Sequence, residues 1–257
     1  MRRFHILACA VTALLLAQPL RMEAQVGEYR SQLALGVNGG YVLSTVGFNP
    51  EIPQKQYGGL TGGLSVRYTC EKYFKSVCAL VAEVNLSQTG WREDILTADD
   101  LPVVNPATGL PEEYERRLTY VQVPVFARLG WGRERKGLQF FFQAGPQVGF
   151  FLGDKSKASF DYPQRNTADR IGAQKDAVQD SLAIKNKFDY GIAAGLGLEY
   201  SHPKIGHLML EGRYYYGLGD IFGNSKRDYF GRSNLGNIVI KLTYLIDVFG
   251  TTNSKIK

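Results

Sequence analysis

The chain has 257 residues, a formal net charge of +6 and 44% hydrophobic residues. This positive excess is small and scattered along the sequence, so it does not predict nucleic-acid binding, although it is compatible with attraction to anionic lipid head groups. Beyond the first 24 residues, no apolar run reaches the roughly 20 residues of a membrane-spanning helix. A search for long apolar runs does not detect membrane-spanning strands, because such strands show only alternating hydrophobicity.

The beginning of the chain predicts a secretory signal. Arg2 and Arg3 give a positive start, and residues 6–20 form an apolar stretch of about 15 residues, at the upper end of the usual range for such a signal. Ala24 then supplies a small residue before Gln25, which places the cleavage between these two residues.

Cleavage after residue 24 would leave residues 25–257 as one domain. An uncleaved membrane anchor is the alternative, but the apolar stretch is shorter than a spanning helix. Removing residues 1–24 takes away three arginines and one glutamate, so the formal charge falls from +6 to +4.

About eight segments of the remaining sequence alternate apolar with polar or small residues. In the clearest one, residues 60–69, Leu64 and Val66 share one face while Ser65 and Arg67 share the other. A period of two predicts strands, because successive side chains point to opposite faces. The other segments are residues 33–43, 80–87, 120–129, 138–151, 188–200, 208–218 and 237–247.

The lengths of these segments and of their connections favour a membrane barrel. Each strand should have about 10–14 residues, whereas a globular strand usually has five or six and a tilted spanning strand needs about nine to eleven. Short connections at residues 71–77, 131–137 and 201–206 alternate with long ones at 44–56, 92–117, 152–187 and 219–236. Short periplasmic turns and long extracellular loops are typical of outer-membrane barrels.

Charged side chains are confined to one face of these segments. The apolar rows carry none, whereas the opposite rows hold Arg67, Glu83, Arg128, Asp189, Glu199, Glu211, Arg213, Lys241 and Asp247. A charge on the lipid face costs about 2–4 kcal/mol near the midplane, and a spanning sheet must close to pair its backbone groups. The sequence therefore predicts an all-β, eight-stranded antiparallel transmembrane β-barrel.

The charged row should fill the barrel interior. An eight-stranded barrel is just wide enough for side chains to occupy its lumen. Both signs are present, so we expect a paired network of Arg67, Glu83, Arg128, Glu199, Glu211, Arg213 and Lys241, with an ion pathway as the alternative. A wide pore is not expected, and function should then reside in the long loops or in lateral contacts.

Aromatic residues gather near the ends of the predicted strands, where outer-membrane barrels carry aromatic girdles. We expect Tyr68, Trp131, Tyr200 and Phe249 near the periplasmic interface, and Tyr41, Phe150, Tyr190, Tyr214 and Tyr216 near the outer one. The alternative is ordinary strand propensity, which tyrosine and phenylalanine have anyway. Of the longest loops, residues 92–117 are acidic and 152–187 are mixed in charge. Each is either a binding surface or a solvated, mobile segment.

Few residues suggest chemistry. Cys70 and Cys78 flank a short turn on adjacent strands, and facing residues of an antiparallel pair have a separation that overlaps disulfide geometry. We expect a disulfide there, with free thiols as the alternative. His202 and His207 surround one predicted periplasmic turn without a metal-ligand pattern. The sequence therefore predicts no catalytic residue, metal or cofactor, and a protein that is not an enzyme.

Three segments resemble a known family. The strand Tyr120-Val-Gln-Val-Pro-Val-Phe-Ala-Arg128 and the segments at residues 84–90 and 144–149 are similar to the PorT-type outer-membrane β-barrel family of Bacteroidota. Gln122 stands where many members carry an acidic residue. The resemblance covers nearly the whole chain after the signal, and it implies an eight-stranded barrel without catalytic residues. It also implies a part in type IX secretion, the export of proteins such as gingipain-type proteases to the cell surface.

The leading hypothesis is an integral protein of the Gram-negative outer membrane that supports secretion or maturation of surface proteins. Its expected partners are outer-membrane lipid, lipopolysaccharide and other proteins of the secretion machinery. Two alternatives stay open, a structural barrel that tethers or packs lipid and a lipid-modifying barrel enzyme.

Overall fold

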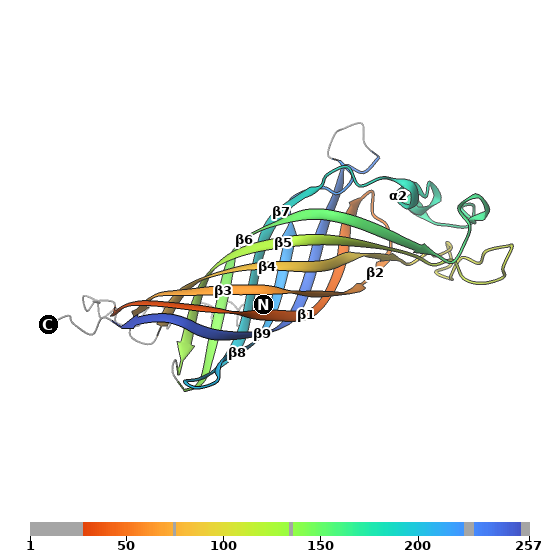
Figure 1. Ribbon diagram of the computed structural model, residues 1–257. Coiled ribbons are helices and arrows are strands. Elements are labelled where there is room, and N and C mark those ends of the chain that lie inside the picture. Colours follow the sequence, from red (N-terminus) through yellow and green to blue (C-terminus); the bar gives the residue numbers. More distant parts are fainter. Residues whose placement is uncertain (1–27, 74–75, 134–135, 224–228, 253–257) are drawn as a thin grey trace, which may run out of the picture.

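The computed structural model describes residues 28–73, 76–133, 136–223 and 229–252. It is an elongated all-β structure with one ring of strands, and a smaller body of loops lies at one end (Figure 1). The predicted signal segment, with Ala24 and Gln25, lies outside the described residues.

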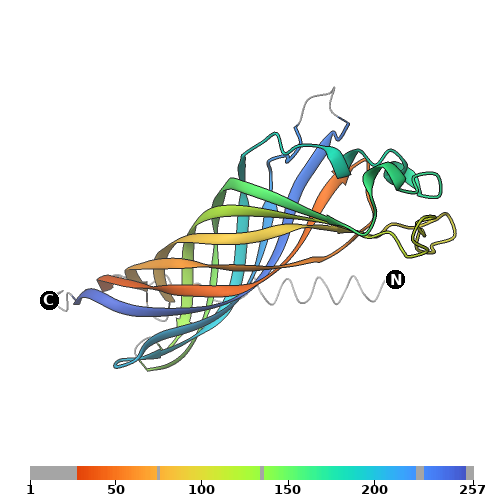
Figure 2. The same ribbon diagram turned by 45° about the vertical axis from the view of Figure 1, so that its right-hand side comes forward.

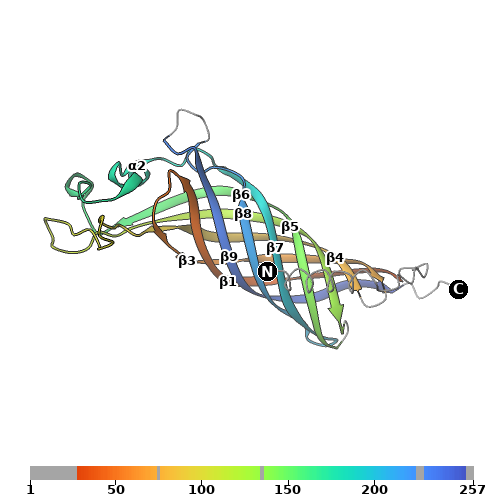
Figure 3. The same cartoon turned by 180° about the vertical axis from the view of Figure 1, so that it is seen from behind.

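Eight long strands form the ring. In chain order they are β1 (Glu28–Asn49), β3 (Tyr57–Tyr73), β4 (Ser76–Glu93), β5 (Tyr114–Gly132), β6 (Gly137–Ala158), β7 (Phe188–His202), β8 (Gly206–Gly217) and β9 (Arg232–Thr252). Each strand pairs antiparallel with its neighbours, and the β1–β9 and β4–β5 pairings close the sheet (Figure 3). A short additional strand, β2 (Gln54–Lys55), pairs with the end of β4.

The long strands have between 12 and 22 residues, so the expected range of 10–14 is wrong for most of them. The pairing continues beyond the apolar band, and Asn49 at the end of β1 still faces Arg232 at the start of β9. Alternation also continues there, because Val46 and Phe48 are buried while Gly47 between them is exposed. The expected long loops shorten accordingly to residues 50–56, 94–113, 159–187 and 218–231, of which 224–228 lie outside the described residues.

The predicted division of the two faces is confirmed along the strands. The apolar rows point outward, where Leu64 is 63% exposed and Ile192 is 57% exposed. The opposite rows point inward, and Arg67, Glu83 and Lys241 are buried. Large aliphatic side chains are exposed and ions are buried, which is the opposite of the arrangement in a water-soluble protein. This arrangement suits a barrel in lipid.

Close backbone approaches explain why two inward positions are glycine. A Cβ at Gly36 would lie 1.8 Å from the carbonyl oxygen of Tyr244, and one at Gly63 would lie 1.9 Å from that of Val84. The neighbouring strand passes so near that any larger residue would force it away. These glycines leave room in the lumen for the long charged side chains.

The two ends of the ring differ. The start of β1 and the end of β9 lie at the same end as the short turns, since Glu28 faces Lys72 and Arg30 faces Thr252. The opposite end carries the long loops, with the 3-10 turns Tyr162–Gln164 and Gly172–Lys175 and the single-turn helix α2 (Val178–Ser181) (Figure 2). None of the helices among the described residues is long and apolar enough to span a membrane.

Candidate functional site

A cluster of four charged side chains crosses the middle of the lumen. The carboxylate of Glu83 on β4 accepts two hydrogen bonds of 3.1 Å from the guanidinium of Arg213 on β8. Arg213 also donates from Nε to Glu211 at 2.8 Å. The ammonium of Lys241 on β9 contacts Glu83 and lies 3.8 Å from Glu211. All four residues are buried, so the lumen is bridged by ions from three strands.

This central cluster is electrically balanced, since two cations face two carboxylates. Burying an ion costs several kcal/mol unless partners replace the lost water. Further partners are present, because Asn85 donates to Glu83 at 2.9 Å and Gln143 donates to Glu211 at 2.8 Å. The Arg213 guanidinium also lies 4.3 Å from the ring centre of Phe126. The geometry thus favours mutual neutralisation over a path for ions.

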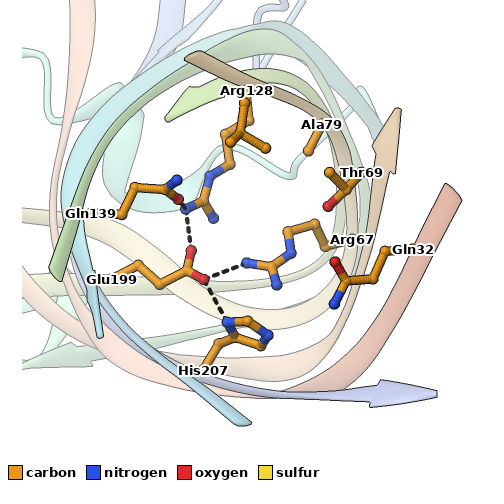
Figure 4. Close-up of a pocket in the computed structure, with 9 residues that line it drawn as sticks. Gln32, Arg67, Thr69, Ala79, Arg128, Gln139, Glu199 and His207 are labelled. Atoms are coloured by element: carbon orange, nitrogen blue, oxygen red, sulfur yellow. Dashed lines mark hydrogen bonds and ion pairs between the residues drawn. The ribbon is translucent and has the colours of Figure 1, made fainter. Parts of the chain in front are cut away.

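A second cluster lies nearer the short turns and is centred on Glu199 of β7 (Figure 4). Its carboxylate accepts a 2.7 Å hydrogen bond from Arg67 and a hydrogen bond from Arg128. His207 Nδ1 lies 2.8 Å from the same carboxylate, and His207 Nε2 lies 3.1 Å from Asp247 at the end of the barrel. The second cluster therefore links the lumen to the rim on the short-turn side.

The space beside the second cluster is small. A cavity of about 30 Å³ lies between Gln32, Arg67, Gln139 and Glu199. A water molecule needs roughly 10–15 Å³, so the cavity has room for two or three waters and none for a larger solute. The lumen at this level is closed by side chains.

An apolar plug closes the lumen at the long-loop end. The ring centres of Phe48 and Trp91 lie 5.4 Å apart, those of Phe48 and Phe230 lie 4.9 Å apart, and Phe222 packs edge-on against Trp91 at 6.0 Å. These side chains come from β1, β4 and the segment between β8 and β9, in which Phe222 and Phe230 contribute to the seal. A passage of solute would have to displace both this plug and the central cluster.

The structure brings the seven predicted lumen residues together, but in two clusters and with additional members. Sequence reasoning missed the neutral partners Asn85, Gln143 and Gln139, because an amide in an inward row is not distinctive by itself. It also placed His207 at a periplasmic turn. The sequence signal that it belongs to the lumen is its position in the same alternating row as the charged Glu211 and Arg213.

Above the barrel, the two longest loops form a folded body that we call the cap (residues 94–113 and 159–187). Arg170 donates to Glu112 at 2.9 Å and lies 3.4 Å from Asp180, and its side chain is completely buried. Burial raises the pKa of the Asp180 carboxyl, while the charge of Arg170 opposes that rise. These loops were expected to be either a binding surface or a solvated, mobile segment. The buried ion pairs hold them in a folded body, which does not fit a mobile segment.

The cap is joined to the barrel wall through Arg116 of β5. Its guanidinium donates to Asp154 at 2.8 Å and to the backbone carbonyls of Leu182 and Gln179 at 2.6 and 3.3 Å. Gln179 of α2 in turn donates to the Glu93 carboxylate at 3.1 Å. The cap and the wall therefore share polar contacts that hold the cap over the plug.

The expected disulfide is wrong for this structure, in which Cys70 and Cys78 are not joined. A bulge in the β3–β4 pairing leaves Cys70 without a facing residue, so that Glu71 faces Cys78. The Cys70 thiol instead donates to the carbonyl oxygen of Tyr68 at 3.7 Å. Among the described residues, no group of three or more histidine, cysteine or acidic side chains is arranged to hold a metal ion.

The predicted girdle residues lie on the outer surface of the ring. Phe249 and Tyr200 are exposed near the short-turn end, and Phe150 and Tyr190 are exposed toward the long loops. Tyr68 differs, because it is only half exposed and its hydroxyl lies 3.0 Å from that of Ser31. This arrangement is the one expected of residues at the two membrane interfaces.

Comparison with known proteins gives one family match. A family model described as an outer membrane protein beta-barrel domain matches residues 17–223. No curated protein matches the chain.

Solved structures with low similarity include three bacterial surface barrels. Ail, the attachment invasion locus protein of Yersinia pestis, is 12% identical, with 84% of this chain and 99% of that chain covered and a TM-score of 0.36. Neisserial surface protein A is 10% identical, with coverages of 82% and 97% and a TM-score of 0.40. The outer membrane protein OprG from Pseudomonas aeruginosa is 13% identical, with coverages of 86% and 98% and a TM-score of 0.38.

Proposed function

Since the chain belongs to the outer membrane protein β-barrel domain family, we propose that this outer-membrane barrel supports the secretion or maturation of surface proteins without acting as a wide pore. The cap and the outer wall are then the parts that meet partners. The signal at residues 1–24 would direct the chain to the periplasm before insertion, and residues 25–257 would form the barrel domain.

The sealed lumen is the observation that carries the non-conducting part of the proposal. Glu83, Arg213 and Lys241 bridge the ring, and Trp91 closes its outer mouth with three phenylalanines. Opening this path would leave buried charges without their partners, and breaking a buried ion pair costs about 3–5 kcal/mol. A barrel built in this way is suited to present surfaces, and it is not suited to conduct folded proteins.

The secretion part rests on the resemblance to the PorT-type family. The three segments of that resemblance lie on the adjacent strands β4, β5 and β6, so they form one continuous part of the wall. Other proteins of the type IX machinery are the proposed partners, and gingipain-type proteases are the proposed class of cargo.

A gene deletion tests the secretion proposal. We expect surface proteases to be lost from the cell surface while the envelope stays intact, and the wild-type gene should restore them. Unchanged export in the deletion strain would contradict the proposal and favour a structural barrel. A change in the outer-leaflet lipids with unchanged export would instead favour the lipid-modifying enzyme.

Conductance tests the sealed lumen independently of secretion. The purified protein in a planar bilayer should show no large, steady conductance. A double variant, Arg213→Ala with Lys241→Ala, removes both cations of the central cluster and should raise the frequency of small openings. A large conductance from the wild-type protein would contradict the sealed lumen.

A further inference from the structure

The outer surface of β5, β6 and β7 changes abruptly from apolar to basic. Val121 on β5 faces Phe150 on β6, and Phe150 faces Phe188 on β7, so these three outward side chains share one level. Toward the long loops, the next outward charged pair is Arg117 on β5 facing Lys155 on β6. Lipid-facing aromatic residues lie at head-group level, so the cations beyond them lie where lipid phosphates are found.

We call Arg117, Lys155, Lys157 and Lys187 the basic band. Its three lysines are exposed, and among the described residues no carboxylate forms an ion pair with any of them. The nearby acids are engaged elsewhere, because Asp154 bonds the inward Arg116 at 2.7 Å and Glu115 bonds Arg92 at 2.9 Å. Glu115 also faces Lys157 across β5 and β6, so the band as a whole has a net positive charge on the outside of the barrel.

The band extends into an open groove on β7. This groove has a volume of about 510 Å³ and is lined by Lys185, Asn186, Lys187, Phe188, Tyr190, Gly219 and Asp220. Asp220 is the acidic residue of this lining; its Oδ1 accepts the backbone N–H of Ser233 at 2.6 Å, and among the described residues it forms no ion pair with Lys187. Phe188 and Tyr190 are about half exposed and stack at 6.1 Å, so they form an apolar floor next to cations.

We propose that the basic band and this groove bind the phosphate-bearing head group of an outer-leaflet glycolipid. The lysines supply point charges for phosphate and Arg117 supplies a planar fork, while the Phe188–Tyr190 floor contacts the acyl chains. The band covers more than one level above the aromatic residues, which suits a large phosphorylated saccharide better than a small head group.

A lipid fits this place better than a protein or a nucleic acid. Lys187 lines the same groove as the outward Phe188 and Tyr190, so a ligand that reaches its ammonium lies against the outer wall of the barrel. An acidic protein would have to approach from above, past the exposed Glu113 carboxylate, whereas a lipid reaches Lys155 and Lys187 from the membrane side. The modest charge of the chain does not favour nucleic acid either.

The test is a titration of the detergent-solubilised full-length barrel with lipid A that carries two phosphates, followed by native mass spectrometry. The variant is Lys155→Gln with Lys187→Gln, and the matched control is Lys204→Gln, an exposed lysine in the turn at the other end of the barrel. We expect roughly a fivefold loss of affinity for each band lysine removed and no loss for the control. Replacing both band lysines by arginine should keep the affinity, which separates charge from folding.

Two further arms identify the source of the phosphate. Lipid A stripped of its phosphates should bind at least tenfold more weakly, and millimolar inorganic phosphate should not displace the intact lipid. Equal binding of the two lipids, displacement by inorganic phosphate, or an equal loss in Lys204→Gln would overturn the proposal. All these measurements use purified protein, so their outcome does not depend on whether the protein has a role in secretion.

Discussion

Arg170 and Glu112, which lie 58 residues apart in two different loops, form a 2.9 Å ion pair in which neither side chain is exposed. Such a pair is costly unless the surrounding structure holds it in place. Its presence means that the cap is a folded body with its own polar core. The barrel therefore presents a defined surface to the cell exterior.

The Arg170→Ala variant should release the cap. Glu112 would remain buried without its cation, at a cost of about 3–5 kcal/mol to the local structure. Limited proteolysis of intact cells should then cleave residues 159–187 much faster than in the wild type. Lys175→Ala removes an exposed cation from the same loop and should cleave at the wild-type rate. Equal rates for Arg170→Ala and the wild type would show that the pair does not hold the cap.

The cap should also loosen as the pH rises. Burial raises the pKa of Asp180 in the docked cap, so the undocked loop loses this proton more readily. The resulting stabilisation is fully present below the ordinary aspartate pKa and is lost as the pH rises through the raised value. Arg170 and Arg165 oppose the effect, and Glu93 contributes a second acidic group at the same place.

Hydrogen exchange of residues 159–187, corrected for the intrinsic rate, measures this dependence. Protection should decrease with rising pH in the wild type and change less in Asp180→Asn, which has the same shape and no charge. Protection that increases with pH, or an equal slope in the variant, would contradict the role of Asp180.

Two substitutions in the central cluster should have strongly non-additive effects on the free energy of unfolding. Glu83→Gln leaves Arg213 and Lys241 with one carboxylate and should destabilise the barrel by about 3–5 kcal/mol. Adding Lys241→Met restores the charge balance, so the double variant should be more stable than the sum of the single effects by about 0.5–3 kcal/mol. Urea unfolding in lipid vesicles gives these values.

The control for this experiment is Glu113→Gln, since that carboxylate is exposed at the cap. It should unfold within about 0.5 kcal/mol of the wild type, as surface substitutions usually do. Strict additivity of Glu83→Gln and Lys241→Met would mean that these residues do not share one network.

The alternation of apolar and polar residues was enough to predict the barrel. A charge in lipid is so costly that the charged row must face the lumen and the apolar row must face the lipid. It could not show how far a strand continues above the lipid, where no such penalty acts. The β1 strand therefore reaches Asn49, whereas the prediction ended it at residue 43.

The lumen was predictable in kind but not in detail. Inward charges of both signs imply pairing, yet the partners depend on the register of strands far apart in sequence, such as Glu83 and Arg213. Ser65 shows the same limit, because its hydroxyl accepts a 2.8 Å hydrogen bond from Asn38 in the filled lumen, a contact that its place in the inward row does not reveal. The bulge at Cys70 carries no sequence signal of its own.

The placement of the outer wall in lipid is tested most directly by two leucines with nearly equal exposure. Leu64 is 63% exposed on the outward face of β3, and Leu101 is 61% exposed in the cap. Heat-modifiable migration of outer-membrane fractions on a gel measures whether each arginine variant has assembled. Leu64→Arg should not give the gel band of the folded, membrane-inserted protein, whereas Leu101→Arg should still give it. Equal behaviour of the two variants, or folded Leu64→Arg protein in the soluble periplasm, would contradict the account.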